Sequence, residues 1–517
     1  MKKIFLYPLV AALAVFAGAA TAQTTLRIGL AEDPDVLDPT LARTFVGRIV
    51  FNSLCDKLFD LDEKLNIVPQ LATSYTWSAD HKALTIKLRQ GVTFHDGEKL
   101  DAAAVKFNLE RHKTMQGSNR RGELAPVTSV DVVDAQTVRL NLAAPFAPLL
   151  AVLTDRAGMM VSPKAAQAEG AHFGTHPVCS GPFKFVERVA GQRWVFARND
   201  AFPAALGGPP RVGQLVIAVV DEPATKFAGL ASGDLDFAGI APSMAALAER
   251  DPTMRVLDYP VLQESGLLFN THRAPFDDVR VRRAFDLSID RERIVTAALA
   301  GYARAASGPV APESPFALAL ESTRNPRAAD SLLDAAGWRR TPDGTRARDG
   351  RPMAIELLTV GSGDQAVEQL VQADLAERGV RMEIRVVEFG AFLARVRAVP
   401  KTFDLLLTGI PGDLSLAYLS AMYDGRQRGS ALDYADYHTP RLDSLFARTR
   451  TATTRATTVG AWHDVQAELA RDQPAAWLYH SRGLQGIARR MQGVRMDLRG
   501  ELASLSRWSV AAAPGSR

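Results

Sequence analysis

The sequence predicts an α/β protein built as two large or three smaller domains. Along the first part of the chain, segments of alternating apolar residues, typical of strands, are interleaved with segments of helical periodicity. The chain has 517 residues, of which 47% are hydrophobic and 23% charged, as in ordinary globular proteins. Length and composition therefore indicate a large core that needs no disulfide merely to form.

The N-terminus has the pattern of a secretory signal peptide. Two lysines precede an apolar run over positions 4–20, and the small residues Ala20-Thr21-Ala22 close the run. The run is too short and too rich in alanine to remain as a membrane anchor, and no later apolar stretch is long enough to span a bilayer. We therefore expect cleavage after Ala22, a mature chain that begins at Gln23, and export to the periplasm.

The charge of the chain argues against nucleic acid or an anionic membrane as a partner. The formal net charge is +4, and it falls to +2 when Lys2 and Lys3 leave with the signal peptide. Such a nearly neutral balance gives neither a nucleic acid nor an acidic membrane surface much to attract. The sequence contains no heptad pattern, low-complexity tract or fixed-period repeat.

Local patterns predict the first elements of the fold. Alternating residues indicate strands over Thr24–Glu32 and Leu84–Leu88. Apolar residues at helical spacing indicate a helix within Val46–Asp62, on or near which Cys55 lies. Asp101 is the expected N-cap of a further helix. Later turn and cap signals predict a hairpin in 129–142, a helix from Asp277 or Asp278, and a hairpin with two Asp-Gly turns in 342–358.

Three longer motifs carry a resemblance to a known family. They are FHDGEKLDAAAVKFNLER at 94–111, CSGPFKFVERVAGQRWVFARNDAF at 179–202 and LLFNTHRAPFDDVRVRRAFDLSIDRERIV at 267–295. In order and spacing they are similar to signatures of the family 5 extracellular solute-binding proteins, which are the peptide, nickel and opine receptors of ABC importers. Weaker similarity continues to the C-terminus, so the resemblance covers nearly all of the mature chain.

The resemblance implies a two-lobed α/β periplasmic binding protein of the large type, which closes on a ligand held between its lobes. Extended segments at Val256–Asn270 and Ala475–Ile487 would be the two hinge crossings, which absorb the backbone rotation of closure. The implied division of the chain is lobe I over 23–265 plus 480–517, with an inserted subdomain at about 56–170, and lobe II over 270–478.

Two charged residues match ligand-binding positions of relatives. Asp413 follows the strand FDLLLTGI, where peptide-binding relatives hold the ligand's α-amino group, and a carboxylate–ammonium hydrogen bond is charge-assisted. Arg156 is at the place where a nickel-chelate receptor directs an arginine toward a ligand carboxylate, which a guanidinium can hold by two parallel donors. The competing interpretations are a solvated loop aspartate and a surface or structural arginine. Relatives often carry a tryptophan where this chain has Ile410, which argues against a standard peptide pocket.

Three further residues are candidates by position alone. Arg120, with Arg121 beside it, lies in a loop able to border the cleft, and a solvated loop is the competing interpretation. Asn270 lies at a crossing, and Glu32 lies in the entrance loop EDPDVLD. Glu32 and its neighbour Asp33 could equally be helix caps or surface charges.

The sequence contains no recognisable catalytic or metal-binding pattern. His172 and His176 have i, i+4 spacing, but Gly174 and Pro177 argue against a helix there, and the glutamate of H-E-x-x-H is missing. The other histidines are scattered, and neither a G-x-S-x-G elbow nor a P-loop occurs. His176 stands three residues before Cys179, yet neither local signature of a cysteine protease surrounds it. We therefore expect no catalytic residue, no cofactor and no metal site, with nickel bound through histidine or a chelator as an open alternative.

The only two cysteines of the chain, Cys55 and Cys179, are expected to form a disulfide. Export makes a disulfide permissible, and the alternative is two free thiols. The family fold implies that both cysteines belong to lobe I.

Together these observations predict the periplasmic substrate-binding component of an ABC importer. The expected partners are a small peptide-like or carboxylate-bearing ligand and a permease in the inner membrane, and the protein is expected to be a monomer. A receptor for an opine, a sugar or a metal chelate is the first alternative. A secreted hydrolase, or a chaperone or signalling receptor on the same fold, are the alternatives from other classes.

Overall fold

The computed structural model describes residues 24–321, 323–360, 365–502 and 505–511. The expected signal peptide and its cleavage site lie outside these described residues. Among the residues that are described, no helix is long and apolar enough to cross a membrane.

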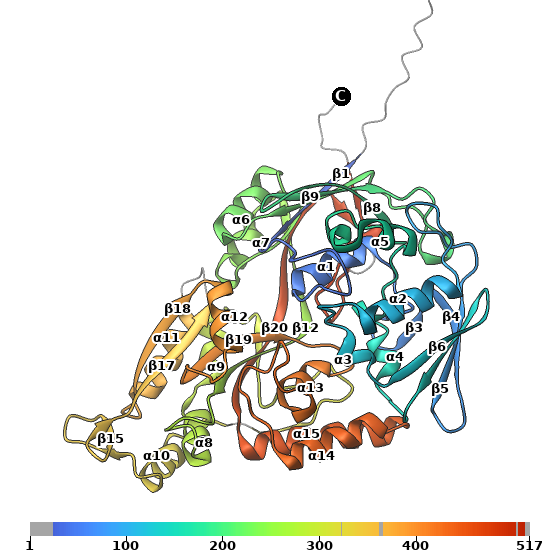
Figure 1. Cartoon of the computed structure of the whole chain (residues 1–517). Helices are drawn as coiled ribbons and strands as arrows, with labels where there is room; N and C mark the ends of the chain where they lie inside the picture. Colours follow the sequence, from blue (N-terminus) through green and yellow to red (C-terminus); the bar gives the residue numbers. More distant parts are fainter. Residues whose placement is uncertain (1–23, 322, 361–364, 503–504, 512–517) are drawn as a thin grey trace, which may run out of the picture.

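One sheet of eleven strands runs through both halves of the molecule (Figure 1). Its centre is the antiparallel pair β12 (Met254–Phe269) and β20 (Ala475–Ala488). The strand order is β18-β17-β19-β12-β20-β11-β1-β10-β9-β8, and β13 also pairs with β20. The other strands are β1 (Thr25–Leu30), β8 (Phe183–Val189), β9 (Arg193–Arg198), β10 (Gln214–Val219), β11 (Phe237–Gly239), β13 (Ala303–Ala305), β17 (Ala354–Val360), β18 (Arg381–Val387) and β19 (Leu405–Pro411).

The half of the molecule at the top of Figure 1 is built around β1, the predicted N-terminal strand. β1 lies between β10 and β11 and is parallel to both. Leu26 and Ile28 of β1 point to one face and are fully buried in a core that includes Ile49 and Val50 of α1 (Phe45–Leu54). Because side chains alternate along a strand, the intervening residues face the opposite side of the sheet. The other helices of this half are α5 (Pro163–Glu169), α6 (Pro223–Ser232) and α7 (Ala245–Arg250).

A second, four-stranded sheet is inserted after α1. Its strands β4 (Ala72–Trp77), β5 (Ala83–Leu88), β7 (Thr137–Leu142) and β6 (Val127–Asp134) are antiparallel in that order, and α2 (Ala102–Thr114) packs against the sheet. Asp101 is the N-cap of α2, and its carboxylate accepts a hydrogen bond from the backbone N–H of Ala104 at 3.0 Å. The predicted strand at 84–88, the N-cap and the hairpin within 129–142 are therefore confirmed.

The lower half has helices on both faces of β12, β17 and β19. Adjacent residues of one strand enter different cores, as Leu405 and Leu406 of β19 do, because strand side chains alternate. Asp278 is the N-cap of the predicted helix α8. The expected double Asp-Gly hairpin forms β14 (Arg339–Arg340), β15 (Arg346–Arg348) and β16 (Arg351–Pro352). One face carries α8 (Val279–Ser288), α10 (Pro326–Ala335) and α11 (Ala366–Ala376), and the other carries α12 (Phe389–Arg397), α13 (Ala417–Tyr423), α14 (Pro440–Thr451) and α15 (Arg455–Asp472).

The predicted helix within Val46–Asp62 is shorter than its apolar pattern suggested. α1 ends at Leu54, Cys55 is its C-cap in an extended conformation, and Phe59–Leu61 form strand β2. The helical spacing of Leu58 and Phe59 is therefore misleading, because these residues are buried in the core of the inserted sheet. Tertiary contacts override the local periodicity at this point.

Cys55 and Cys179 form the expected disulfide. Their Cα atoms are 4.9 Å apart across a sequence separation of 124 residues, and the bond joins the end of α1 to the loop before β8. The next residues also hold this junction, since the N–H of Gly181 donates to the carbonyl of Leu54 at 2.9 Å. A Cβ at position 181 would lie 2.5 Å from that carbonyl oxygen, so only glycine fits. The Ser-Gly-Pro signature is therefore structural.

Removing this disulfide should lower stability without changing the fold. The bond closes a long loop, and its chain-entropy contribution is about 4–5 kcal/mol. We expect the Cys55→Ala/Cys179→Ala protein to unfold at a clearly lower urea concentration than the oxidised wild type. The free energy of unfolding with and without reductant measures the effect. Reductant should shift the wild type and leave the double variant unchanged, and equal midpoints for all four samples would contradict a stabilising bridge.

Glu264 is a buried, unpaired carboxyl group at the centre of β12. Its residue is 2% exposed, and neither carboxylate oxygen has a hydrogen-bond partner among the described residues. It lies opposite His480 of β20 and Ile410 of β19, next to two register shifts of the β12–β20 pair. Burial raises the pKa of Glu264 to about 8. The folded protein therefore keeps this group protonated at pH values where the unfolded chain ionises it.

Stability should consequently fall as pH rises from about 4.5 to about 8, the window between the ordinary and the raised pKa of Glu264. In this window the folded state binds more protons than the unfolded state, so each pH unit favours unfolding. Glu264→Gln removes this group while keeping its size. We expect the variant to match the wild type near pH 5 and to melt at a higher temperature near pH 8.5. Other titrating groups are common to both proteins, so an identical difference at both pH values would refute the assignment.

Candidate ligand-binding cleft

Two arginines from the inserted region converge on one short loop. Arg156 opens the 3₁₀ turn η1 (Arg156–Gly158), and its Nη1 donates to the carbonyls of Ala42 and Thr44, both at 3.3 Å. Arg120 precedes α3 (Arg121–Leu124), pairs with Glu123 and donates from Nη2 to the carbonyl of Ala42 at 3.4 Å. The two guanidinium groups are therefore anchored side by side.

Neighbouring charges hold Arg156 in place. Asp155 caps the turn, since its Oδ1 accepts from the backbone N–H of Arg156 at 2.6 Å, and its Oδ2 lies 3.4 Å from Nη1 of Arg48. Burial, reinforced by the charge of Arg120, lowers the pKa of Arg156 to about 10. Although burial opposes ionisation of Asp155, the nearby Arg48 and Arg156 hold the pKa of its carboxyl below the usual range. Arg156 and Asp155 are therefore both charged at neutral pH.

Asp413 approaches the same region from the other half of the molecule. It lies in the loop between β19 and α13, is half-buried, and accepts hydrogen bonds from the hydroxyl of Ser415 and from the N–H of Ala417 at 3.4 Å. Burial, reinforced by the negative charge of Asp155, raises the pKa of Asp413, and Arg48 opposes this shift. The charge of Asp413 also contributes to the raised pKa of Glu123. Asp413, Arg120 and Arg156 therefore belong to one electrostatic cluster.

The two halves touch around this cluster. The N–H of Ala147 donates to the carbonyl of Arg450 at 2.8 Å, and a Cβ built on Gly122 of α3 would lie 3.4 Å from Oε1 of Gln427. Figure 1 shows α3 and α4 (Leu149–Val152) opposite α13 and α15 on this side of the molecule. The charged cluster thus lies where segments of both halves meet.

The structure gives Asn270 and Glu32 other surroundings. Asn270 is buried, and its side-chain amide donates to the carbonyl of Phe403 at 2.8 Å, so it fixes the segment that leads into β19. Its position at the end of a crossing strand is structural. Glu32 is exposed in the loop after β1, where partial desolvation raises the pKa of its carboxyl. The neighbouring Asp33 instead accepts from Nε1 of Trp194 at 2.7 Å.

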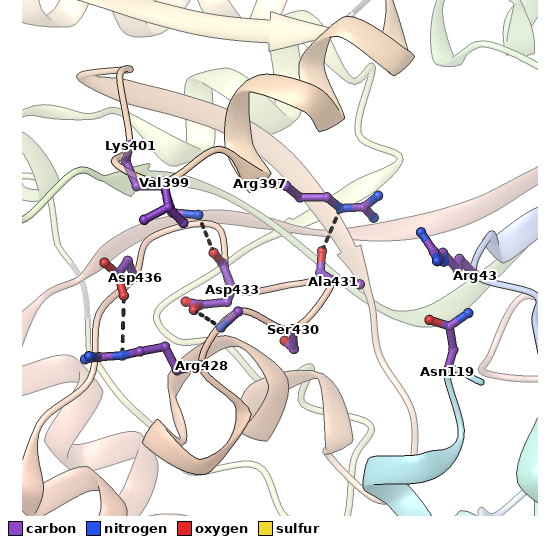
Figure 2. Close-up of a pocket in the computed structure, with 11 residues that line it drawn as sticks. Arg43, Asn119, Arg397, Val399, Lys401, Arg428, Ser430, Ala431, Asp433 and Asp436 are labelled. Atoms are coloured by element: carbon purple, nitrogen blue, oxygen red, sulfur yellow. Dashed lines mark hydrogen bonds and ion pairs between the residues drawn. The ribbon is translucent and has the colours of Figure 1, made fainter. Parts of the chain in front are cut away.

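A cavity of about 510 Å³ lies between the two halves (Figure 2). Its lining was missed by the sequence analysis, because the residues come from separate segments and none stands in a recognisable motif. Arg43 and Asn119 form one wall, and the other wall comes from the segments around α12 and after α13. The remaining lining residues are Arg397, Val399, Lys401, Arg428, Gly429, Ser430, Ala431, Asp433 and Asp436.

Asp433, Asp436 and His438 form a cluster beside this cavity that the sequence analysis also missed. Nε2 of His438 lies 3.1 Å from Oδ1 of Asp433 and 3.8 Å from Oδ1 of Asp436. Burial opposes protonation of His438, but its hydrogen bond to Asp433 raises the pKa above the usual value. Asp433 also accepts a hydrogen bond from the N–H of Gly429 at 2.7 Å. Nε of Arg428 lies 3.6 Å from Oδ1 of Asp436. These contacts indicate an ion-pair network that holds the cavity wall.

Two halves joined by paired strands, with a cavity and a cluster of charged groups between them, define a two-lobed periplasmic-type binding protein. A family model described as "Bacterial extracellular solute-binding proteins, family 5 Middle" matches residues 66–429. The chain belongs to this family, whose members are transport binding proteins and not enzymes. They bind small ligands such as peptides, deliver them to ABC permeases, and are periplasmic or extracellular.

Known proteins of this kind match most of the chain. The glutathione-binding protein GsiB of Pectobacterium atrosepticum is 28% identical over 471 residues, which are 88% of each protein. The structure of NikA from Brucella suis in complex with Fe(III)-EDTA has a TM-score of 0.85 and 24% identity, and the match covers 94% of this chain and 99% of that one. The oligopeptide-binding protein AppA from Bacillus subtilis, in complex with a nonapeptide, has a TM-score of 0.84 and 22% identity over 95% of this chain and all of that one.

Proposed function

We propose that this protein captures a short peptide-like ligand, with a free amino group and a carboxylate, and presents it to an ABC permease in the inner membrane. The proposal includes export by the N-terminal signal peptide with cleavage after Ala22, and action as a periplasmic monomer. It also takes the lobes as 23–265 plus 480–517 and 270–478, so that β12 and β20 are the hinge crossings.

The observation that carries the proposal is the pairing of opposite charges across the cleft. Asp413 from lobe II would receive the ligand's ammonium group, and Arg156 with Arg120 from lobe I would receive a carboxylate. The Nε atoms of both arginines are buried and have no hydrogen-bond partner among the described residues. Nε of Arg156 lies 3.6 Å from Oδ1 of Asp155, an ion-pair contact without a hydrogen bond. A bound carboxylate would satisfy these donors through charge-assisted hydrogen bonds.

The ligand class follows from this charge pattern and from the relatives. Glutathione, after which the GsiB proteins are named, is a short peptide with one amino group and two carboxylates. Ile410, where many relatives have a tryptophan, is 2% exposed and packs into a lobe II core with Leu406 and Leu419. Its side chain gives the ligand no flat wall, so recognition would depend on charges more than on aromatic stacking.

Closure would follow from contacts that the ligand makes to both lobes. A ligand shifts a two-state equilibrium only by its extra affinity for one state. A peptide held at its amino end by lobe II and at a carboxylate by lobe I gains its second set of contacts only in the closed form. The ligand itself therefore stabilises the closed form, which is the form that a permease would receive.

Neutralising either side of this charge pair should weaken binding without unfolding the protein. We expect Asp413→Asn and Arg156→Ala each to raise the Kd for glutathione about tenfold or more, because each removes a charge-assisted hydrogen bond. Isothermal titration calorimetry measures the Kd, and circular dichroism checks the fold. Arg193→Ala is the matched control, since Arg193 forms an exposed pair with Glu187 far along the sheet.

The same titrations decide among ligand classes. Glutathione, Gly-Gly, nickel–histidine and Fe(III)-EDTA are offered to the wild type in turn, and tight binding of a metal chelate alone would replace the peptide proposal with the chelate alternative. Unchanged affinity in both Asp413→Asn and Arg156→Ala for the ligand that binds would show that the site lies elsewhere.

A further inference from the structure

Two arginines with no acidic partner face each other across the cavity between the lobes. Arg43 comes from the loop before α1, and Arg397 is the last residue of α12 (Figure 2). In the part of the chain that the structure describes, neither guanidinium forms an ion pair. Nε of Arg397 donates to the carbonyl of Ala431 at 3.2 Å, which orients the group, and the picture shows its far end directed toward Arg43 and Asn119.

The rest of the cavity lining does not neutralise these two charges. Nζ of Lys401 donates hydrogen bonds to the backbone carbonyls of Val396 at 2.6 Å and Asp433 at 2.8 Å. Arg428 forms an ion pair with Asp436. The carboxylate of Asp433 is already hydrogen-bonded to the N–H of Gly429 and to Nε2 of His438. Four cationic side chains therefore line the cavity with two acidic ones, which leaves two formal positive charges in excess.

Closure of the lobes brings these like charges together. Repulsion between two guanidinium groups is modest in water and grows as the space between them loses solvent. An anionic group between them reverses the sign of the interaction, because a guanidinium binds carboxylate or phosphate oxygens through parallel donors. A volume of about 510 Å³ is in the usual range of ligand pockets, so it can hold a whole arm of a ligand.

The cavity and the charged cluster share one wall. Asn119, which lines the cavity, directly precedes Arg120, and its N–H donates to the carbonyl of Thr40 at 2.9 Å. Arg120 and Arg156 bond to the carbonyl of Ala42, the residue before Arg43. A single extended ligand can therefore contact the cluster and the cavity along the same loop.

We propose that Arg43 and Arg397 form a second subsite, which binds an anionic group between the lobes. The group is a carboxylate or phosphate, either a second acidic arm of the captured ligand or a free anion that binds beside it. The ligand-arm version rests on the proposed function, and the free-anion version does not. In both versions the anion holds the two lobes together at the mouth of the cleft.

The test removes both charges and uses probes that differ in charge. The variant is Arg43→Gln/Arg397→Gln, and its control is Arg193→Gln/Arg495→Gln, which removes the same charge from two exposed surface pairs. The probes are glutathione with two carboxylates, Gly-Gly with one, and inorganic phosphate. Calorimetry gives the Kd of each peptide, and the melting temperature reports on phosphate.

A second carboxylate in the subsite predicts about a tenfold weaker affinity of the variant for glutathione, with the affinity for Gly-Gly not weakened, because the variant also lacks the repulsion between the two arginines. A free anion predicts that phosphate raises the melting temperature of the wild type and the control more than that of the variant, since an anion bound only to the folded state stabilises it. The inference is overturned if the variant matches the control with all three probes.

Failure of this inference and failure of the proposed function are distinguishable. If Asp413→Asn and Arg156→Ala weaken peptide binding while Arg43→Gln/Arg397→Gln does not, and phosphate acts equally on all proteins, only the second subsite is wrong. If no peptide binds the wild type, the phosphate measurement alone decides whether the subsite exists.

Discussion

The antiparallel ladder of β12 and β20 is the constraint on which the rest of the structure depends. These two strands belong to both halves, so the half-sheets, their helices and the cleft are placed relative to one ladder. Asp413 follows β19, which pairs with β12 up to Pro411, and the N–H of Leu262 in β12 bonds to the carbonyl of Leu498. Segments from both halves are thus tied to these two strands.

Glu501, near the C-terminus, contributes a negative charge to the charged cluster. Glu501 lies 2.9 Å from Nε of Arg48, and Arg48 in turn contacts Asp155, the cap of the turn that carries Arg156. Burying such charges is costly unless every one is paired, and removing one partner leaves an uncompensated charge. The network therefore gives Arg156 a fixed orientation more than it gives the fold stability. A residue close to the C-terminus is in this way connected, through Arg48 and Asp155, to the turn that carries Arg156.

Local chemistry made much of the fold predictable from the sequence. The caps Asp101 and Asp278, the Asp-Gly turns and the pairing of the only two cysteines depend on neighbouring residues or on compartment, and all were confirmed. The predicted end of α1 was wrong, because a disulfide and a second core override the helical spacing of the apolar residues there. Of the candidate site, Arg120, Arg156 and Asp413 fall into one cluster, whereas the side chain of Asn270 is bonded to the carbonyl of Phe403. The cavity around Arg43 and Arg397 could not be predicted, since its residues meet only when the lobes do.

The charged cluster contains both signs, whereas the cavity lining has positive charge in excess, and this difference bears on specificity. In the inner cluster the acidic and basic residues partly neutralise one another, so an empty closed form costs little there. At the mouth, Arg43 and Arg397 face each other without an acid, so empty closure is penalised. A ligand that supplies negative charge at the mouth removes the penalty and adds attraction, whereas a ligand of the same shape without that charge does not. If the proposed second subsite is correct, discrimination would come both from contacts to the anion and from a repulsion that only an anionic ligand relieves.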